Sequence, residues 1–150
     1  MKAIIVLLFG AATVFAIDVT AVLGVNKPYL DERAGFAAGA AIRIPVTERL
    51  SVRPELLWSS IPNYVHVFAL GSVIYDFSDP SKPAVGYVIG SAGASHLRER
   101  SFFRNTEFAW QGGAGVRFNL PGSWVSSAEL RIGPAAIPLT TFSIGYTWNP

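Results

Sequence analysis

The chain has 150 residues, of which 51% are hydrophobic and only 15% are charged, and its formal net charge is +2. These values fit one folded domain, exclude a disordered chain and provide no basic footprint for a nucleic-acid partner. The sequence contains no cysteine, which excludes disulfide scaffolds, cysteine-based metal sites and cysteine nucleophiles.

The first sixteen residues have the pattern of a secretory signal peptide. Lys2 precedes an apolar run from Ala3 to Val14, and Val14-Phe15-Ala16 places short residues where a signal peptidase cleaves, before Ile17. The run is too short to span a membrane as a helix, which needs about 20 residues. The sequence therefore predicts an exported protein with a signal peptide at 1–16 and one domain at 17–150.

The exported part contains eight segments that read as strands, separated by residues typical of turns. In chain order these predicted strands are Ile17–Asn26, Ala34–Val46, Leu50–Ser59, Val65–Asp76, Ala84–Ser95, Glu107–Leu120, Val125–Gly133 and Thr140–Trp148. Three connectors are short, at Val46–Arg49, Ser78–Ser81 and Leu120–Ser123, and the connector His96–Thr106 is the longest. Short turns at one end and longer loops at the other are typical of an up-and-down membrane barrel.

In six of these segments the two faces differ sharply. One face carries no charged residue, whereas the other is rich in glycine and holds only Val22 and Leu57 as large apolar residues. Four arginines and four acids fall on this second face: Asp18, Arg43, Arg53, Glu55, Glu107, Arg117, Glu129 and Arg131. Buried charges persist when they are paired, and glycines fit a narrow barrel interior. The sequence therefore predicts an all-β fold, an eight-stranded antiparallel up-and-down transmembrane β-barrel whose lumen is polar and filled by a charge network.

Two stretches give less information. The segment Val65 to Tyr75 is apolar on both faces, so the pattern does not define which residues between 65 and 95 face inward. Pro54 lies inside a predicted strand and cannot donate a ladder hydrogen bond, which predicts a bulge or a local opening.

Aromatic residues gather near the predicted strand ends. Membrane barrels carry aromatic girdles at both interfaces, although aromatic side chains also pack in ordinary cores. The residues predicted to lie at the interfaces are Trp58, Tyr64, Phe118, Trp124, Tyr146 and Trp148.

Four stretches resemble small bacterial outer-membrane β-barrel proteins, in particular the outer-membrane protein A-like barrel domain. They are Val52–Trp58, Gly112–Phe118, Ala128–Arg131 and Phe142–Trp148. The resemblance implies a Gram-negative outer-membrane location, both termini in the periplasm and a salt-bridged lumen of arginine and glutamate. It also implies contact with outer-membrane lipid and lipopolysaccharide, and with the barrel-assembly machinery and periplasmic chaperones during biogenesis.

The function predicted from these features is non-enzymatic, structural or in surface interaction, with no cofactor, no metal and no nucleic-acid partner. Arg98, Arg100 and Arg104 make the longest connector basic, which predicts contact with anionic lipopolysaccharide or a surface ligand; the alternative is a solvated loop. Two other functions stay open. One is a soluble, lipocalin-like ligand-binding barrel, which requires an apolar interior. The other is a lipid A-modifying hydrolase that uses the adjacent Ser95 and His96.

Overall fold

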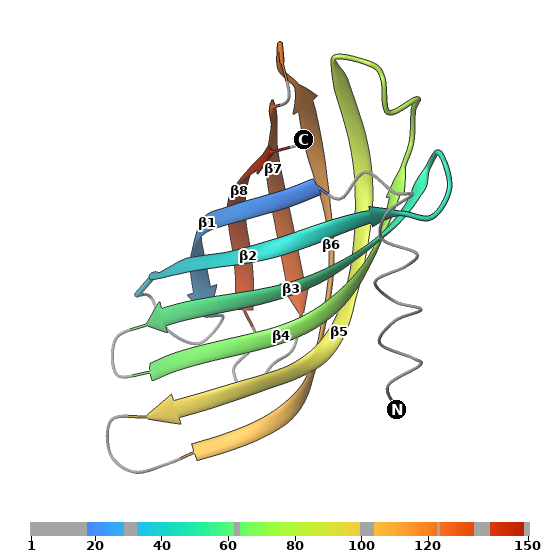
Figure 1. Cartoon of the computed structure of the whole chain (residues 1–150). Helices are drawn as coiled ribbons and strands as arrows, with labels where there is room; N and C mark the ends of the chain where they lie inside the picture. The colour runs from blue at the N-terminus through green and yellow to red at the C-terminus, as the bar shows by residue number, and fades with distance from the viewer. Residues whose placement is uncertain are drawn as a thin grey trace, which may run out of the picture.

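Eight strands follow one another along the chain, and each pairs antiparallel with the next (Figure 1). The computed structural model describes residues 18–28, 33–61, 64–99, 104–122, 124–133 and 139–148. The strands are β1 (Asp18–Pro28), β2 (Gly35–Pro45), β3 (Leu50–Ile61), β4 (Tyr64–Asp76), β5 (Ala84–Glu99), β6 (Arg104–Asn119), β7 (Trp124–Gly133) and β8 (Leu139–Trp148). Within these residues no helix is long and apolar enough to cross a membrane.

The first and last strands close the sheet into a barrel. β1 pairs with β8 from Val19 opposite Trp148 to Pro28 opposite Leu139. Following the strand registers once around the barrel from Asp18 leads back to Pro28, ten residues further along β1. With the usual residue and strand spacings this stagger corresponds to a tilt of about 40°. Ten residues at that tilt rise about 25 Å, the height of the apolar band in membrane barrels. The predicted fold class is confirmed.

One end of the barrel, called the short-turn end below, carries the β2–β3, β4–β5 and β6–β7 connections together with the start of β1 and the end of β8. Local hydrogen bonds close these turns. Thr47 Oγ1 accepts from the Leu50 N–H at 3.0 Å, and Asp79 accepts from both the N–H and the hydroxyl of Ser81. The Ser81 hydrogen bonds lower the pKa of Asp79. Gly122, with φ of 86°, supplies the left-handed residue of the third turn.

The opposite end, called the loop end, differs from the sequence prediction. β5 continues to Glu99 and β6 begins at Arg104, so most of the predicted loop His96–Thr106 is strand, with Arg98 opposite Arg104. The β5–β6 hairpin extends furthest at the lower left of Figure 1. The strand residues of this segment were predicted as loop because all of them except Leu97 are polar, so no continuous apolar face marks the hairpin as strand.

Pro54 produces a local opening and no bulge. The register between β2 and β3 is the same on both sides of it, with Ala41 opposite Glu55 and Ile44 opposite Val52. The intervening positions Ile42 and Arg43 are not paired with β3, whereas Pro54 itself pairs with Gly71 of β4. The missing proline N–H explains the gap.

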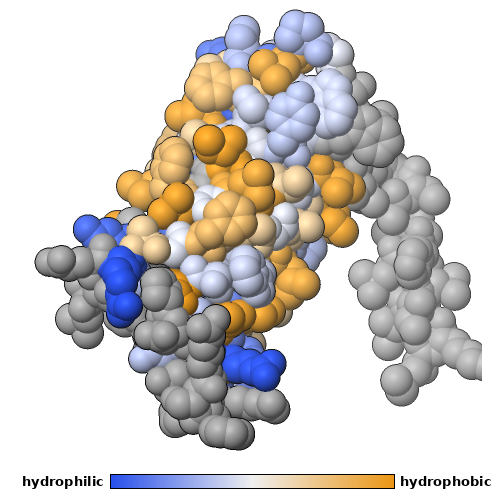
Figure 2. Space-filling model, turned by 90° about the vertical axis from the view of Figure 1, so that its left-hand side faces the viewer, coloured by the Kyte–Doolittle hydropathy of each residue, from blue (hydrophilic) through white to orange (hydrophobic). Residues whose placement is uncertain are grey.

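The outer wall of the barrel is apolar, as Figure 2 shows for one face, where hydrophobic side chains cover the middle and hydrophilic ones lie at the extremes. Exposed aromatic side chains form two groups. Those near the short-turn end are Tyr75, Phe77, Phe118, Trp124 and Tyr146, and those toward the loop end are Phe36, Trp58, Phe108, Trp110 and Phe142. Trp124 stacks on Tyr146 with ring centroids 4.7 Å apart. Tyr64 is half-buried at the loop end, and the side chain of Trp148 lies outside the described part of the chain.

Candidate functional site in the lumen

Inward-facing side chains fill the barrel in layers whose order follows from the strand registers. The middle layer, called the central quartet, consists of Arg53, Glu55, Glu129 and Arg131. The upper apolar layer, toward the loop end, consists of Val22, Leu57, Ile61, Phe68, Leu70 and Ala109. Below the quartet lie Ile74, Tyr87 and Ile89. The lower triad, at the short-turn end, consists of Arg43, Asp76 and Arg117.

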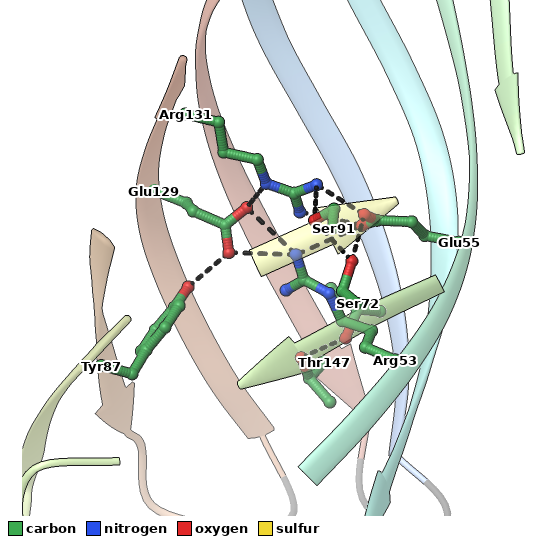
Figure 3. Close-up of polar contacts among 9 residues, drawn as sticks. Arg53, Glu55, Ser72, Tyr87, Ser91, Glu129, Arg131 and Thr147 are labelled. Atoms are coloured by element: carbon green, nitrogen blue, oxygen red, sulfur yellow. Dashed lines mark hydrogen bonds and ion pairs between the residues drawn. The ribbon is translucent and has the colours of Figure 1, made fainter. Parts of the chain in front are cut away.

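The central quartet joins opposite walls of the barrel. Arg53 and Glu55 are two residues apart on β3, and Glu129 and Arg131 are two apart on β7, so strand alternation points all four inward. Arg131 Nη2 lies 2.8 Å from Glu55 Oε2, and its Nε contacts Glu129. Arg53 Nη2 lies 3.0 Å from Glu129 Oε1 and 3.2 Å from Glu55 Oε2 (Figure 3). Each arginine therefore contacts both carboxylates, and the buried charges balance.

Hydroxyl groups from β4 and β5 donate further hydrogen bonds to the two carboxylates of the quartet. The Tyr87 hydroxyl donates to Glu129 Oε2 at 2.8 Å, and the Ser72 hydroxyl donates to Glu55 Oε1 at 2.7 Å (Figure 3). Ser72 also hydrogen-bonds to Ser91. Among the described residues, Arg53 Nε is the one buried polar atom of the quartet without a hydrogen-bond partner. A buried polar network that is otherwise satisfied in this way rigidifies an interior and favours one arrangement of it. The arrangement obstructs the lumen and ties four strands together.

The lower triad is built around an acid that the sequence prediction missed. Asp76, the last residue of β4, is fully buried and accepts from Arg43 at 2.6 Å and from Arg117 at 3.2 Å. Arg43 also donates from Nε to Ser51 at 3.0 Å. Asp18 faces the same end and is the register partner of Arg43. Asp76 was missed because it ends a strand whose inward phase the sequence does not define.

The predicted lumen residues thus separate into distinct groups. Arg53, Glu55, Glu129 and Arg131 form the quartet, Arg43 and Arg117 belong to the lower triad, and Asp18 borders that triad. Placing Glu107 in the network was wrong. It is exposed near the loop end of β6, where it accepts from Asn105, because the hairpin extends past the filled part of the lumen.

The basic connector also needs correction. Arg98 is an exposed residue of β5, and the backbone of Arg104 belongs to β6, so neither lies in a loop. The side chain of Arg104 and all of Arg100 lie outside the described part of the chain. The exposed basic side chain of Arg98 therefore lies on the outer face of the β5–β6 hairpin and not in a loop.

The lumen is also less polar than the sequence predicted. The inward residues of β4 and β5 include large apolar side chains, namely Phe68, Leu70, Ile74, Val85, Ile89 and Leu97. The prediction missed them because it read the lumen face from the other six strands alone. Charges therefore occupy two layers, and apolar packing fills the space between and above them.

Ser95 and His96 do not act as a pair. Ser95 is fully buried in the lumen, whereas His96 points outward, is exposed, and hydrogen-bonds through Nδ1 to Thr106. The histidine that faces inward is His66, which stacks on Phe68 with ring centroids 5.6 Å apart. Neither of its ring nitrogens has a hydrogen-bond partner among the described residues. Among the described residues no group of three His, Asp or Glu side chains is arranged to hold a metal ion.

Three cavities among the described residues of the lumen are small. One of about 10 Å³ lies beside Val22, Leu57 and Phe68 in the upper apolar layer, which is room for a single water molecule. A larger one of about 240 Å³ lies at the short-turn end beside Asp18 and Arg117. A third, of about 20 Å³, lies beside Thr20, Arg53 and Tyr87. Pockets for drug-sized ligands usually occupy about 300–1,000 Å³, so each of these cavities among the described residues is smaller than such a pocket.

Comparisons with known proteins show the fold. No protein-family model matches the chain, and no curated protein sequence matches it. Among solved structures, Neisserial surface protein A superposes with a TM-score of 0.75 at 14% identity, covering 91% of this chain and 97% of that one. The N-terminal β-barrel domain of Pseudomonas aeruginosa OprF gives a TM-score of 0.64 at 13% identity, covering 89% and 97%. The Yersinia pestis outer membrane protein Ail, in a phospholipid bilayer nanodisc, gives 0.55 at 12% identity, covering 89% and 99%. The resemblance to small outer-membrane barrels is confirmed at the level of fold.

Proposed function

We propose that the chain is a non-enzymatic outer-membrane β-barrel whose lumen is filled and whose role is structural or in surface interaction. The observation that carries the proposal is the combination of a closed barrel, an apolar outer wall and charged side chains that lie in the interior or near the two ends of the barrel. Closure pairs the backbone groups of every strand, which a sheet requires in lipid. The quartet balances its four buried charges, and both arginines of the lower triad contact Asp76, so these buried charges have partners of opposite sign.

The outer wall argues against a soluble ligand-binding barrel. Leu23, Leu56 and Ile144 lie on different strands, and each is more than half exposed, at 57%, 58% and 55%. Soluble monomers rarely expose contiguous apolar patches larger than a few hundred square ångströms, whereas this wall surrounds the barrel. Ser95 and His96 point to opposite faces of β5, so they do not form the pair that the hydrolase alternative requires.

The proposal includes an orientation and a ligand class. The signal peptide is removed after Ala16, the short-turn end faces the periplasm, and assembly machinery and chaperones act before insertion. The loop end faces outward, where the exposed Arg98 on β5 contacts anionic lipopolysaccharide. A polyanion is bound in one similar solved structure, that of Ail in complex with the heparin analogue sucrose octasulfate, at 16% identity.

Cell fractionation and gel mobility test the membrane location. We expect the protein in the outer-membrane fraction, with an unboiled sample that migrates differently from a boiled one. Ile144→Arg places a charge on the outer wall and is expected to cost about 2–4 kcal/mol near the bilayer midplane. Leu120→Arg adds the same charge in the β6–β7 turn, where an exposed side chain of similar size is replaced, and serves as the matched control. Protein in the soluble periplasm with no mobility difference, or equal effects of the two substitutions, would contradict the proposal.

Lipopolysaccharide binding is tested separately. Arg98→Gln is expected to weaken binding of purified protein to lipopolysaccharide micelles, and Lys82→Gln at the short-turn end is expected to leave it unchanged. Equal binding by wild type and both variants would remove Arg98 from the contact surface. Mass spectrometry of lipid A with and without the protein tests the hydrolase alternative, and we expect identical spectra.

A further inference from the structure

A polar site lies where the upper apolar layer meets the central quartet. The cavity of about 10 Å³ is lined there by four polar residues from four strands, Asn26 of β1, Gln111 of β6, Arg131 of β7 and Thr141 of β8. The strand registers bring three of them together, because Thr141 is directly opposite both Asn26 and Arg131. Side chains that are opposite each other on one face of a sheet have Cβ atoms roughly 4.5–5.5 Å apart.

Two carbonyl oxygens at this site have no hydrogen-bond partner. Asn26 donates through Nδ2 to Ser59, which leaves its Oδ1 buried and unpartnered. Gln111 Oε1 is likewise buried and unpartnered. Asn26 is 2% exposed and Gln111 is 4% exposed, so bulk water does not reach either oxygen. A buried acceptor without a donor is costly, so both oxygens require a donor from a molecule in the cavity.

Arg131 brings a donor to the same site. A guanidinium has five N–H groups, and the contacts of Arg131 use four of them, from Nε to Glu129, from Nη1 to Glu55 and Ser91, and from Nη2 to Glu55. One N–H of Nη2 therefore remains available in a side chain that lines the cavity. The hydroxyl of Thr141 is a further possible donor.

These groups restrict the chemistry of the occupant. An anion would place its own acceptors against two carbonyl oxygens. A cation would lie beside the Arg131 guanidinium and add an uncompensated charge to a quartet that is already balanced. A neutral molecule with two donors and a free lone pair satisfies every group. The volume of about 10 Å³ admits one molecule of the size of water.

We propose that Asn26 and Gln111 hold one buried water molecule, which donates to Asn26 Oδ1 and Gln111 Oε1 and accepts from Arg131 Nη2. About three hydrogen bonds are typical of a buried water, and such a bridge is nearly as favourable in enthalpy as a direct hydrogen bond. The water extends the central quartet, whose own residues come from β3 and β7, to β1 and β6. The first strand of the barrel is thereby joined to the central network, in addition to its pairing with β8.

The test compares crystal structures of the intact, folded protein from detergent, at a resolution that shows ordered water. In the wild type we expect a density peak within hydrogen-bond distance of Asn26 Oδ1, Gln111 Oε1 and Arg131 Nη2. Gln111→Met keeps the side-chain length but removes the carbonyl acceptor, so the peak should be lost while the quartet contacts remain. Leu70→Met is the matched control, because Leu70 belongs to the upper apolar layer and does not line the cavity. It should keep the peak.

Two further measurements identify the occupant. Crystals grown with rubidium in place of sodium should give no anomalous signal at the peak, because rubidium scatters anomalously and water does not. In solution, ¹⁷O relaxation dispersion detects long-lived water molecules without interference from exchanging hydroxyl or guanidinium protons. Gln111→Met should show one such molecule fewer than the wild type and Leu70→Met.

A wild-type structure without the peak, or with a peak that contacts only one of the two carbonyl oxygens, would overturn the proposal. An anomalous signal from rubidium would overturn it too, because the site would then bind a cation. The same holds for an unchanged peak or an equal ¹⁷O dispersion in Gln111→Met. If gel mobility shows that this variant does not fold, the wild-type structure and the rubidium crystals decide alone. None of these results depends on the membrane location, so cell fractionation still reports separately on the proposed function.

Discussion

Replacing Arg131 with Met removes one cation from the central quartet and retains a side chain of similar length. Arg131 is 2% exposed, and its guanidinium contacts both oxygens of Glu55, one of Glu129 and the hydroxyl of Ser91. After the substitution Arg53 is the only cation beside two buried carboxylates. The quartet then carries one uncompensated negative charge inside the barrel.

The expected loss follows from that imbalance. Removing one partner of a buried ion pair costs about 3–5 kcal/mol, because the remaining charge stays desolvated. Total stabilities of folded proteins are about 5–15 kcal/mol, so the variant should unfold at a much lower urea concentration. The double variant Arg131→Met with Glu55→Gln restores charge balance and should recover about 1–3 kcal/mol, the coupling expected of contacting residues.

Urea unfolding in lipid vesicles, followed by tryptophan fluorescence and by the fraction of heat-modifiable protein on gels, measures both effects. Arg98→Met serves as the control, since Arg98 is exposed on β5. It should change the free energy of unfolding by less than about 0.5 kcal/mol. The reasoning fails if Arg131→Met unfolds at the wild-type midpoint, or if the double variant is no more stable than the single one.

Two further predictions concern packing and hydrogen bonding in the lumen. A Cβ added at Gly93 would collide with backbone atoms of β4, whereas one at Gly90 on the same strand would meet open space. Gly93→Ala should therefore lower the free energy of unfolding by about 1–3 kcal/mol, and Gly90→Ala should leave it almost unchanged. Equal unfolding midpoints for the two variants would contradict this. Tyr87→Phe removes the hydrogen bond to Glu129 and should cost about 1.5–3 kcal/mol, while Tyr75→Phe on the outer wall should be neutral. The same urea assay decides, and a neutral Tyr87→Phe would mean that the hydroxyl contributes nothing to the quartet.

Alternation was sufficient to predict the fold where one face of a strand is apolar and the other is polar. The quartet residues Arg53 and Glu55 on β3, and Glu129 and Arg131 on β7, share the same parity along their strands, so their common direction could be predicted. Their contacts could not, since which arginine reaches which carboxylate depends on the stagger of the barrel. That stagger is set by all eight registers together.

The failures have a single physical cause. A period of two is visible only when the two faces differ, and in β4 both faces are apolar because the lumen there holds Phe68, Leu70 and Ile74. Because the inward face of β4 could not be assigned, Asp76 was not predicted to lie in the lumen. At the loop end of the β5–β6 hairpin the strands continue beyond the apolar wall, and nearly all residues there except Leu97 are polar. Strand residues there were therefore predicted as loop, and Glu107 was placed in the lumen.

The pairing of β1 with β8 makes the folding of this chain depend on its last strand. Until β8 is present, β1 and β7 each keep a row of unpaired amide and carbonyl groups, which lipid does not tolerate and which invite association with other chains. β8 covers both edges by pairing with β7 and with β1, and the pair Val19 with Trp148 is among the most distant in sequence. The barrel can therefore close and insert into the membrane only once β8 is available to pair with β1. A protein truncated before β8 should accumulate as aggregate instead of a smaller barrel.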